Sequence, residues 1–210
     1  MTRLWQGECM TLQRADSPPA TWGGRTISAL QDLYEESFPE AERIPFQQLL
    51  DWLNDGRLQL WLSVDESCFA ITQYLDTPEG DVLLEYLAVR ADCRSEGRGT
   101  DALRALTSQI AGPIVLEVED PEVSVDRFAA RRIDFYERFG ARRIYEAEGY
   151  AMPDLATGGL LPMHLLDLVP SRRERSWTRT TVRTLILAIW TGGYGVDPTD
   201  ARLVSLIAKI

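Results

Sequence analysis

The stretch RSEGRGTDAL, residues Arg94 to Leu103, places two glycines and two arginines directly before an apolar repeat. The apolar side chains recur at helical spacing: Ala102, Leu103, Leu106 and Ile110. The stretch therefore predicts a loop that opens a helix. Glycines let a backbone approach a ligand closely, and the free amides at the start of a helix point toward negative charge. We expect an anion, such as a phosphate group, over Gly97 and Gly99.

The patterns on both sides of this loop predict a mixed α/β fold. Upstream, helices are predicted over 26–38 and 45–53, followed by strands over 58–64, 67–75 and 82–89. The first two strands are short and close together, which favours an antiparallel hairpin. Downstream, the patterns predict a helix stopped at Gly112 and Pro113, a strand over 114–119, a helix capped by Gly140, and two closing strands over 141–150 and 162–169.

The length of 210 residues, of which 45 % are apolar, suits one domain with a full core. From Pro170 onward the character of the chain changes: an arginine-rich stretch precedes two short helical patterns, TLILAIW and DARLVSLIAKI. We expect a domain over 1–169 and a helical extension over 170–210. The extension is expected to pack on the domain or to lie at a homodimer interface.

Composition excludes several classes of partner. The net charge of -10 argues against a nucleic-acid-binding protein, which would show a basic patch or stripe. The longest apolar stretch, TLILAIWTGGYGV, is shorter than the roughly 20 residues that span a bilayer, so no membrane partner is expected. The N-terminus has no apolar run long enough for a signal peptide.

Cysteine and histidine usage predicts a cytoplasmic protein without a metal site. Cys9, Cys68 and Cys93 are odd in number and lack metal-ligand spacing, which favours a reducing compartment. His164 is the only histidine, so a site with several histidines is excluded. We expect His164 to be a structural side chain within a strand.

The glycine loop is compatible with two phosphate-binding motifs. Gly97, Gly99 and Ala102 fit the G-x-G-x-x-A fingerprint of dinucleotide-binding proteins, and Glu119 follows at about the spacing of a ribose-binding acid. In that motif the glycine turn follows its strand almost directly, whereas RADCRSE separates Val89 from Gly97 here. The predicted hairpin upstream also differs from a βαβ unit. A nucleotide-dependent oxidoreductase is therefore the less favoured interpretation.

The longer block LEYLAVRADCRSEGRGTDALRAL resembles motif A of the GCN5-related N-acetyltransferases, which is a strand, R/Q-x-x-G-x-G/A and a helix. Arg94, Gly97 and Gly99 fill the motif. IVLEVE stands where that family has its next strand, and RRIDFYERFGARR resembles motif B. The resemblance covers roughly 58–168, and SFPEAERIP and YAMPDL are similar to a less characterised branch. It implies a central, mostly antiparallel twisted sheet flanked by helices, with acetyl-CoA as co-substrate.

The resemblance also implies a cofactor path. Pantetheine would pair with the backbone of a splayed strand at Leu87, Ala88 and Val89. The pyrophosphate would lie over the loop and helix start, which comprise Arg94, Ser95, Glu96, Gly97, Arg98, Gly99 and Thr100. Many members have an asparagine near the start of the motif B helix. This chain departs from that pattern, because its equivalent stretch offers Arg127, Arg131 or Arg132 instead.

Acetyl transfer to an amine requires a base for the amine proton and benefits from an acid at the leaving thiolate. By resemblance, Tyr136 is the acid, and Glu117 or its rival Glu85 is the base. Burial of Glu117 among apolar neighbours would raise its pKa toward the working range. The alternative is a structural Glu117 satisfied by an arginine.

On the acceptor side, the resemblance places the segment between the first two helices against the substrate, so we expect Glu40, Glu42 and Arg43 there. The predicted reaction is acetyl transfer from acetyl-CoA to a primary amine of a small molecule, by direct attack in a ternary complex. Two alternatives stay open: an acetyltransferase of protein or peptide N-termini, and a non-catalytic acyl-CoA-binding module that uses neither Glu117 nor Tyr136.

Overall fold

The computed structural model describes residues 12–15, 19–124, 128–168 and 176–210. Its strands form one sheet in the order β1-β2-β3-β4-β5-β8-β6, with β7 paired to β8 beside that path. All neighbouring strands are antiparallel except β4 and β5. The strands are β1 (Leu12–Arg14), β2 (Gln59–Ser63), β3 (Cys68–Tyr74), β4 (Val82–Val89), β5 (Ile114–Glu119), β6 (Arg142–Arg143), β7 (Ala151–Pro153) and β8 (Leu160–Leu168).

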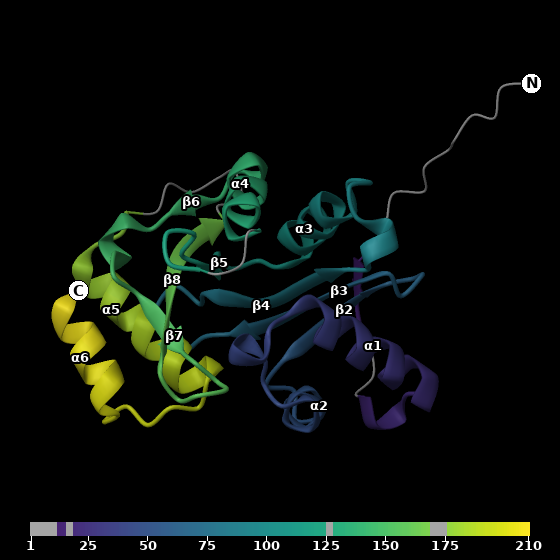
Figure 1. Cartoon of the computed structure of the whole chain (residues 1–210), viewed down its shortest axis with the longest axis horizontal. Helices are drawn as coiled ribbons and strands as arrows, with labels where there is room; N and C mark the ends of the chain where they lie inside the picture. Colours follow the sequence, from purple (N-terminus) through teal and green to yellow (C-terminus); the bar gives the residue numbers. More distant parts are fainter. Residues whose placement is uncertain (1–11, 16–18, 125–127, 169–175) are drawn as a thin grey trace, which may run out of the picture.

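Helices cover both faces of the sheet (Figure 1). On one face lie α3 (Arg98–Gln109) and α4 (Ala129–Phe139). On the other lie α1 (Gly24–Ser37), α2 (Phe46–Asn54), α5 (Arg179–Ala188) and α6 (Ala201–Lys209). Short 3-10 turns are η1 (Pro19–Thr21), η2 (Glu40–Glu42), η3 (Ala91–Cys93) and η4 (Tyr145–Ala147), and η5 (Ile189–Gly193) is a π-helical turn. The fold is thus the mixed α/β, mostly antiparallel arrangement that we expected.

The apolar core differs between the two faces. Under α3 and α4 the buried side chains form one continuous cluster, from Leu12 to Leu168. The opposite face carries two clusters, one under α1 and α2 and one under α5 and α6. Leu155 packs against both of them. Glu85 of β4 and Glu117 of β5 are half-buried and lie where the two clusters of this face meet. We therefore expect a site there.

The parallel strands β4 and β5 diverge where their polar residues begin. Their pairing runs from Val82 opposite Ile114 to Leu84 opposite Leu116, while both strands continue beyond it. A β-bulge also interrupts β4, because Thr72 pairs with Leu84 and Ile71 pairs with Tyr86. Bulges re-aim side chains near active sites. Glu85 is the extra residue, and it stands at the point of divergence.

Most predicted elements are confirmed, including the β2–β3 hairpin, β5, and the left-handed cap of α4 at Gly140, whose φ is 115°. The strand predicted over 141–150 is wrong for most of its length. Only Arg142 and Arg143 form a strand, and the chain then makes turn η4. Ile144, Ala147 and Tyr150 all enter one core cluster, and their spacing of three suits a 3-10 turn rather than a strand.

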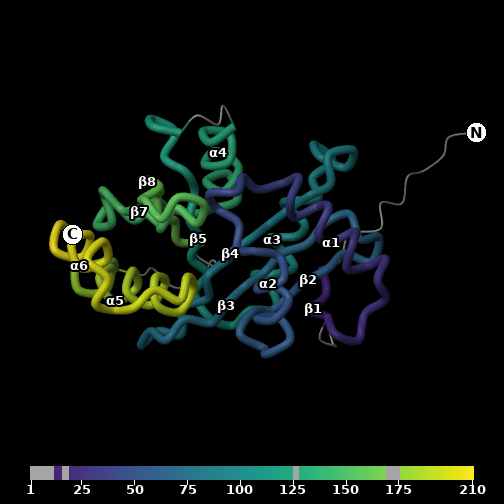
Figure 2. Tube along the Cα trace, turned by 60° about the horizontal axis from the view of Figure 1, so that its bottom comes forward, coloured from purple at the N-terminus to yellow at the C-terminus, as the bar shows by residue number. Residues whose placement is uncertain are grey.

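Both helices predicted in the C-terminal part form, and they pack on the sheet beside β7 and β8 (Figures 1 and 2). Leu185, Trp190 and Leu203 are fully buried in the same cluster as Leu83 and Val115 of the sheet. The arginine-rich stretch before α5 lies mostly outside the described residues. No helix in the described part of the chain is long and apolar enough to cross a membrane.

Candidate active site

The glycine loop forms an open helix start. Gly97 adopts the left-handed backbone conformation, with a φ of 82°, and Ser95 before it also has a positive φ, of 68°. Gly97 is the N-cap of α3 and makes no side-chain cap hydrogen bond. Glycine adopts positive φ without the steric cost that a side chain adds. The first amides of an α-helix have no partner within the helix, so the start of α3 suits the predicted anion.

Gly99 lies where α3 meets α4. A Cβ atom there would lie 3.1 Å from Cζ of Phe135, on α4. Its backbone is not left-handed, so the conformation itself does not demand glycine. Gly99 lets α3 and α4 approach each other, which aligns the helix start with the next helix. Gly97 is thus required by its backbone conformation and Gly99 by the contact between helices, and the predicted approach of a ligand to both glycines stays a prediction.

The two arginines of the loop are held by different partners. Nε of Arg94 donates to the carbonyl oxygen of Val89 at 2.8 Å, across the start of the loop. The Nη1 atom of Arg98 lies 2.5 Å from Oδ2 of Asp65 and 2.6 Å from Oγ of Ser67, in the β2–β3 turn. Arg98 therefore ties α3 to the hairpin and is not simply a solvated turn residue.

We expect Asp65→Asn to lower the Tm by about 1–3 °C at pH 7, the range for a partly exposed ion pair in a chain of this size. Partial burial acts to raise the pKa of Asp65, but hydrogen bonds from Ser67, Arg98 and Ser63 hold it well below its ordinary value. The carboxylate therefore stabilises the fold above about pH 4, and this contribution fades as the pH falls below that.

Thermal unfolding at pH 7 and at pH 3 measures this effect, with exposed Asp76→Asn as the matched control. The difference between Asp65→Asn and the parent chain should shrink at pH 3. A difference that stays constant with pH would contradict the ionised role of Asp65.

The end of β4 offers an unpaired backbone edge. Leu87, Ala88 and Val89 pair with β3 on one side. Pairing with β5 on the other side ends at Leu84, within the described residues. An extended group such as pantetheine fits such an edge, because it can take the hydrogen bonds that a neighbouring strand would otherwise make. The predicted path from this edge to the start of α3 is thus continuous along the chain.

Glu85 carries a carboxyl oxygen without a partner. Its Oε1 atom is shielded from solvent and has no hydrogen bond among the described residues. A Cβ at Gly193, in η5, would lie 3.3 Å from this oxygen. Burial and the nearby charge of Glu117 raise the pKa of Glu85 to about 8, while Arg57 opposes the shift. A carboxyl group poised near neutral pH is suited to proton transfer.

Glu117 is held by two tyrosines. Oη of Tyr150 donates to Oε1 at 2.5 Å, and Oη of Tyr194 donates to Oε2. Burial raises the pKa of Glu117, and both hydrogen bonds oppose that rise. In the described structure the partners of Glu117 are thus tyrosine hydroxyls rather than the arginine that the structural alternative expected. Tyr150 lies in the YAMPDL segment that the sequence singled out, whereas no local signal pointed to Tyr194.

Tyr136 lies on α4, which covers the same face of the sheet as α3. It is half-buried, and its ring packs edge-on against Phe135 with a centroid distance of 5.0 Å. Burial raises the pKa of Tyr136 to about 12, while the nearby Arg132 lowers it. A phenol in that state is protonated at neutral pH and can donate its proton.

The arginines proposed near the start of α4 have distinct positions. Arg132 forms an ion pair with Glu119 at the end of β5. Glu119 would hold a ribose in the dinucleotide interpretation, but here its carboxylate is paired with Arg132 of α4. Arg131 lies over the ring of Phe128, 5.5 Å from its centroid. Arg127 lies outside the described residues.

Of the three predicted acceptor residues, the structure brings one to the site. Burial and the charge of Glu119 raise the pKa of Glu42 to about 8, and its Oε1 is shielded without a hydrogen bond in the described part of the chain. Glu40 is exposed. Arg43 turns toward the carbonyl oxygen of Glu35, at 3.4 Å.

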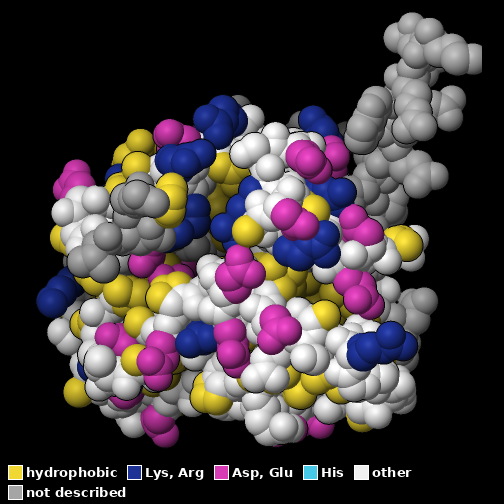
Figure 3. All heavy atoms as spheres, turned by 45° about the vertical axis from the view of Figure 1, so that its right-hand side comes forward, with side chains coloured by type: hydrophobic (Ala, Val, Ile, Leu, Met, Phe, Trp, Pro, Cys, Tyr) yellow, Lys and Arg dark blue, Asp and Glu magenta, His cyan; other side chains and the backbone are white. Residues whose placement is uncertain are grey.

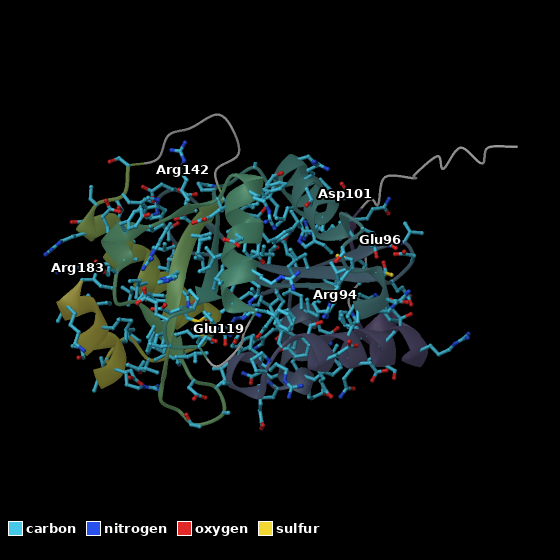
Figure 4. The ribbon with its side chains drawn as sticks, turned by 45° about the horizontal axis from the view of Figure 1, so that its top comes forward. Arg94, Glu96, Asp101, Glu119, Arg142 and Arg183 are labelled. Carbon is cyan, nitrogen blue, oxygen red and sulfur yellow. The ribbon has the colours of Figure 1, made fainter. Side chains whose placement is uncertain are left out.

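The two segments that resembled one family branch are in contact. The amide of Leu155 donates to the carbonyl oxygen of Ala41 at 2.8 Å, which links the β7–β8 loop to η2. This bond bridges the division between the two core clusters. In Figure 4, Arg94, Glu96 and Asp101 lie on the right-hand side, Glu119 lies near the middle, and Arg142 and Arg183 lie on the left.

The described residues show no group of three or more His, Cys, Asp or Glu side chains that could hold a metal ion. Nε2 of His164 lies 3.4 Å from Oδ1 of Asp120, as a side chain on β8. Cys68 and Cys93 are free thiols, and Cys9 lies outside the described residues. Charged side chains of both signs are interspersed over the face in Figure 3.

Comparison with known proteins identifies the family. Residues 27–141, more than half of the chain, match the model of the acetyltransferase (GNAT) family. The chain belongs to the GNAT acetyltransferase family. No curated protein matches it significantly. This membership removes the dinucleotide-binding interpretation of the glycine loop.

Several solved structures share the fold. A GNAT-family protein from Bacteroides thetaiotaomicron superposes with a TM-score of 0.69 at 26% identity, over 82% of this chain and 94% of its own. An aminoglycoside 6'-N-acetyltransferase solved with coenzyme A gives 0.54 at 17% identity, over 78% and 100%. The ribosomal-protein-S18-alanine N-acetyltransferase of Escherichia coli gives 0.50 at 16% identity, over 80% and 98%.

Proposed function

We propose that this GNAT protein transfers an acetyl group from acetyl-CoA to a primary amine of a small molecule, by direct attack in a ternary complex. The observation that carries the proposal is the unpartnered oxygen of Glu85 at the point where β4 and β5 diverge. A buried carboxyl oxygen without a hydrogen bond is costly unless a ligand or a proton uses it.

The residues around the divergence fit acetyl-CoA. The free edge of Leu87 to Val89 would receive pantetheine, and the open start of α3 at Gly97 would hold the pyrophosphate. Acetyl-CoA supplies the activated acetyl thioester. The protein has to bind this group, deprotonate the amine and protonate the departing sulfur.

Glu85 is the base in this proposal. Both oxygens of Glu117 already accept hydrogen bonds from tyrosines, whereas Oε1 of Glu85 is free in the described structure. Glu85 takes a proton from the bound ammonium group, and the neutral amine then attacks. As the nitrogen–carbon bond forms and the carbon–sulfur bond breaks, Tyr136 protonates the departing sulfur. The second proton of the nitrogen leaves to solvent, from which Tyr136 is reprotonated. The neighbouring charge of Glu117 strengthens Glu85 as a proton acceptor.

The acceptor is a cationic amine. Glu42, Glu85 and Glu117 are half-buried carboxyl groups contributed by η2, β4 and β5. Ionised carboxyl groups at low dielectric attract an ammonium group more strongly than they would in water. Because the pKa values of Glu42 and Glu85 are raised to about 8, this attraction grows as the pH rises toward 8. The same charge disfavours anionic acceptors, so we expect amines without a nearby carboxylate to be the better substrates.

Tyr136→Phe is expected to lower kcat by about 10²-fold, the lower end of what a positioned acid contributes. The phenol protonates the thiolate, and phenylalanine keeps the ring packing against Phe135. Affinity for acetyl-CoA should be unchanged, which calorimetric titration can measure beside the steady-state kinetics. Unchanged turnover across the usable pH range would remove Tyr136 as the acid.

Calorimetric titration of the purified chain with acetyl-CoA, CoA and NAD in parallel tests the proposal first. Micromolar binding of acetyl-CoA and CoA, without NAD binding, is the expected result. A screen of diamines, amino sugars, amino acids and peptides with a free N-terminus then follows acetyl-CoA-dependent product formation. Binding without turnover of any amine would favour the acyl-CoA-binding module, and turnover of peptides alone would favour a protein-directed enzyme.

A further inference from the structure

Tyr194 reaches the candidate site from far along the chain. It is separated from Glu117 by 77 residues, and it lies beyond residue 141, where the match to the family model ends. Its hydroxyl donates to Oε2 of Glu117 and lies 3.7 Å from the sulfur of Met152. The C-terminal segment therefore contributes directly to the surroundings of β5.

The turn before Tyr194 is anchored to the sheet. Nε2 of Gln73 donates to the carbonyl oxygen of Gly192 at 2.9 Å, and Arg57 donates to the same oxygen. The guanidinium of Arg57 in turn lies over the ring of Trp52, 3.6 Å from its centroid. These contacts hold the π-helical turn, a form often found at functional sites, against β3 and α2.

The same turn backs Glu85. Gly193 stands against the carboxyl group of Glu85, and its neighbour Tyr194 binds Glu117. One short segment of the extension thus touches both carboxylates of the candidate site. Trp190, fully buried, fixes the start of the turn by donating to the carbonyl oxygen of Ala151 at 3.2 Å.

We propose that the described part of the extension, residues 176–210, completes the active site, and that Tyr194 is a positioning residue that holds Glu117 as a fixed anion beside Glu85. The proposal rests on the proposed function. Tyr194 acts through Glu117 and has no assigned contact with the reacting atoms. Tyr150 supplies the second bond, so the carboxylate is clamped at both oxygens.

The charged and titratable groups facing this pair come from several elements. Glu117 faces Tyr150, Tyr194, Glu85 of β4 and, at longer range, Glu42 of η2. Glu85 additionally faces Arg57. Removing one tyrosine hydroxyl weakens the stabilisation of the Glu117 anion, which raises the pKa of Glu117. Protonated Glu117 would no longer raise the pKa of Glu85 or attract the ammonium group.

Tyr194→Phe tests the proposal because it removes the hydroxyl and keeps the ring. We expect KM for the amine to rise about 10-fold at pH 7. We also expect the acid limb of the pH profile, where kcat/KM falls as the pH is lowered, to move to lower pH. Affinity for acetyl-CoA should be unchanged. The matched control is Tyr74→Phe, an exposed tyrosine at the end of β3 that should behave as the parent chain.

A second readout does not depend on activity. NMR titration of the protein carrying ¹³C-labelled glutamate carboxyl groups follows Glu117 directly, with Glu117→Gln to assign its signal. In Tyr194→Phe the Glu117 signal should titrate at least one pH unit higher than in the parent chain. An unchanged Glu117 titration in folded Tyr194→Phe would overturn the positioning role.

The two readouts separate failure of this proposal from failure of the proposed function. A chain without acetyltransferase activity whose Glu117 signal still shifts would keep the Tyr194–Glu117 coupling and reject the reaction. An active chain in which KM, the acid limb and the Glu117 signal all stay unchanged would keep the reaction and reject the role of Tyr194. Tyr150→Phe, which removes the opposite bond, should show the same shifts as Tyr194→Phe.

Discussion

Glu85→Gln is expected to lower kcat for amine acetylation by about 10²–10³-fold at pH 8, within the range that a general base contributes. Glutamine keeps the shape of the side chain but cannot take the amine proton. In the parent chain activity should rise with pH through about 8, because Glu85 accepts a proton only once it is deprotonated. In Glu85→Gln this rise of kcat with pH should be absent. The pH dependence of kcat at saturating amine measures it.

At pH 8 the stability of Glu85→Gln should match or exceed that of the parent chain, because burial raises the pKa of Glu85 to about 8 and the substitution removes the cost of ionising this carboxyl group. Thermal unfolding checks this. Glu36→Gln, an exposed position on α1, is the matched control and should change neither activity nor stability. If Glu85→Gln retains full activity while Glu117→Gln loses it, Glu117 is the base and our assignment is wrong.

Gly97→Val is expected to reduce acetyl-CoA affinity by at least 100-fold. A β-branched side chain is strongly disfavoured at the φ of 82° that Gly97 adopts, so the loop must change conformation. The amides at the start of α3 would then no longer converge on the pyrophosphate. Calorimetric titration with acetyl-CoA measures the loss, and thermal unfolding monitors the fold.

The control for this substitution is Gly80→Val, in the β3–β4 turn. Gly80 has a φ of 65° and, like Gly97, an open space where a Cβ would lie. Both variants therefore carry a similar backbone penalty, of roughly 1–2 kcal/mol. Only Gly97→Val should lose acetyl-CoA binding. Equal losses in both variants would mean that general destabilisation, rather than the anion cradle, explains the result.

Much of the fold was predictable because its determinants are local. Apolar spacing predicted α1, α3 and α4, and the sequence between Val89 and Gly97 distinguished this loop from a dinucleotide fold. The strand predicted over 141–150 failed because a spacing of three at Ile144, Ala147 and Tyr150 satisfies a turn that packs on the C-terminal helices. Those helices are distant in sequence, so the local pattern could not distinguish a strand from a turn.

The candidate site was predictable in its parts but not in its assignments. The sequence named Glu85, Glu117 and Tyr136 from their positions in strands and motif B. It could not tell which carboxylate is free, because that depends on a bulge in β4 and on hydroxyl donors from elsewhere. It likewise proposed Glu40, Glu42 and Arg43 together, and only Glu42 points toward the site.

The sequence by itself determined the glycine loop before α3 and most of the helices and strands, and these carry the resemblance to the GNAT family. These features follow from hydrogen bonding and sterics within a few residues, such as the freedom of glycine at positive φ. Only the tertiary structure decided that Tyr150 and Tyr194 clamp Glu117 and leave Glu85 free. Burial and hydrogen-bond partners are contacts through space, and a contact across 77 residues leaves no periodic trace in the chain.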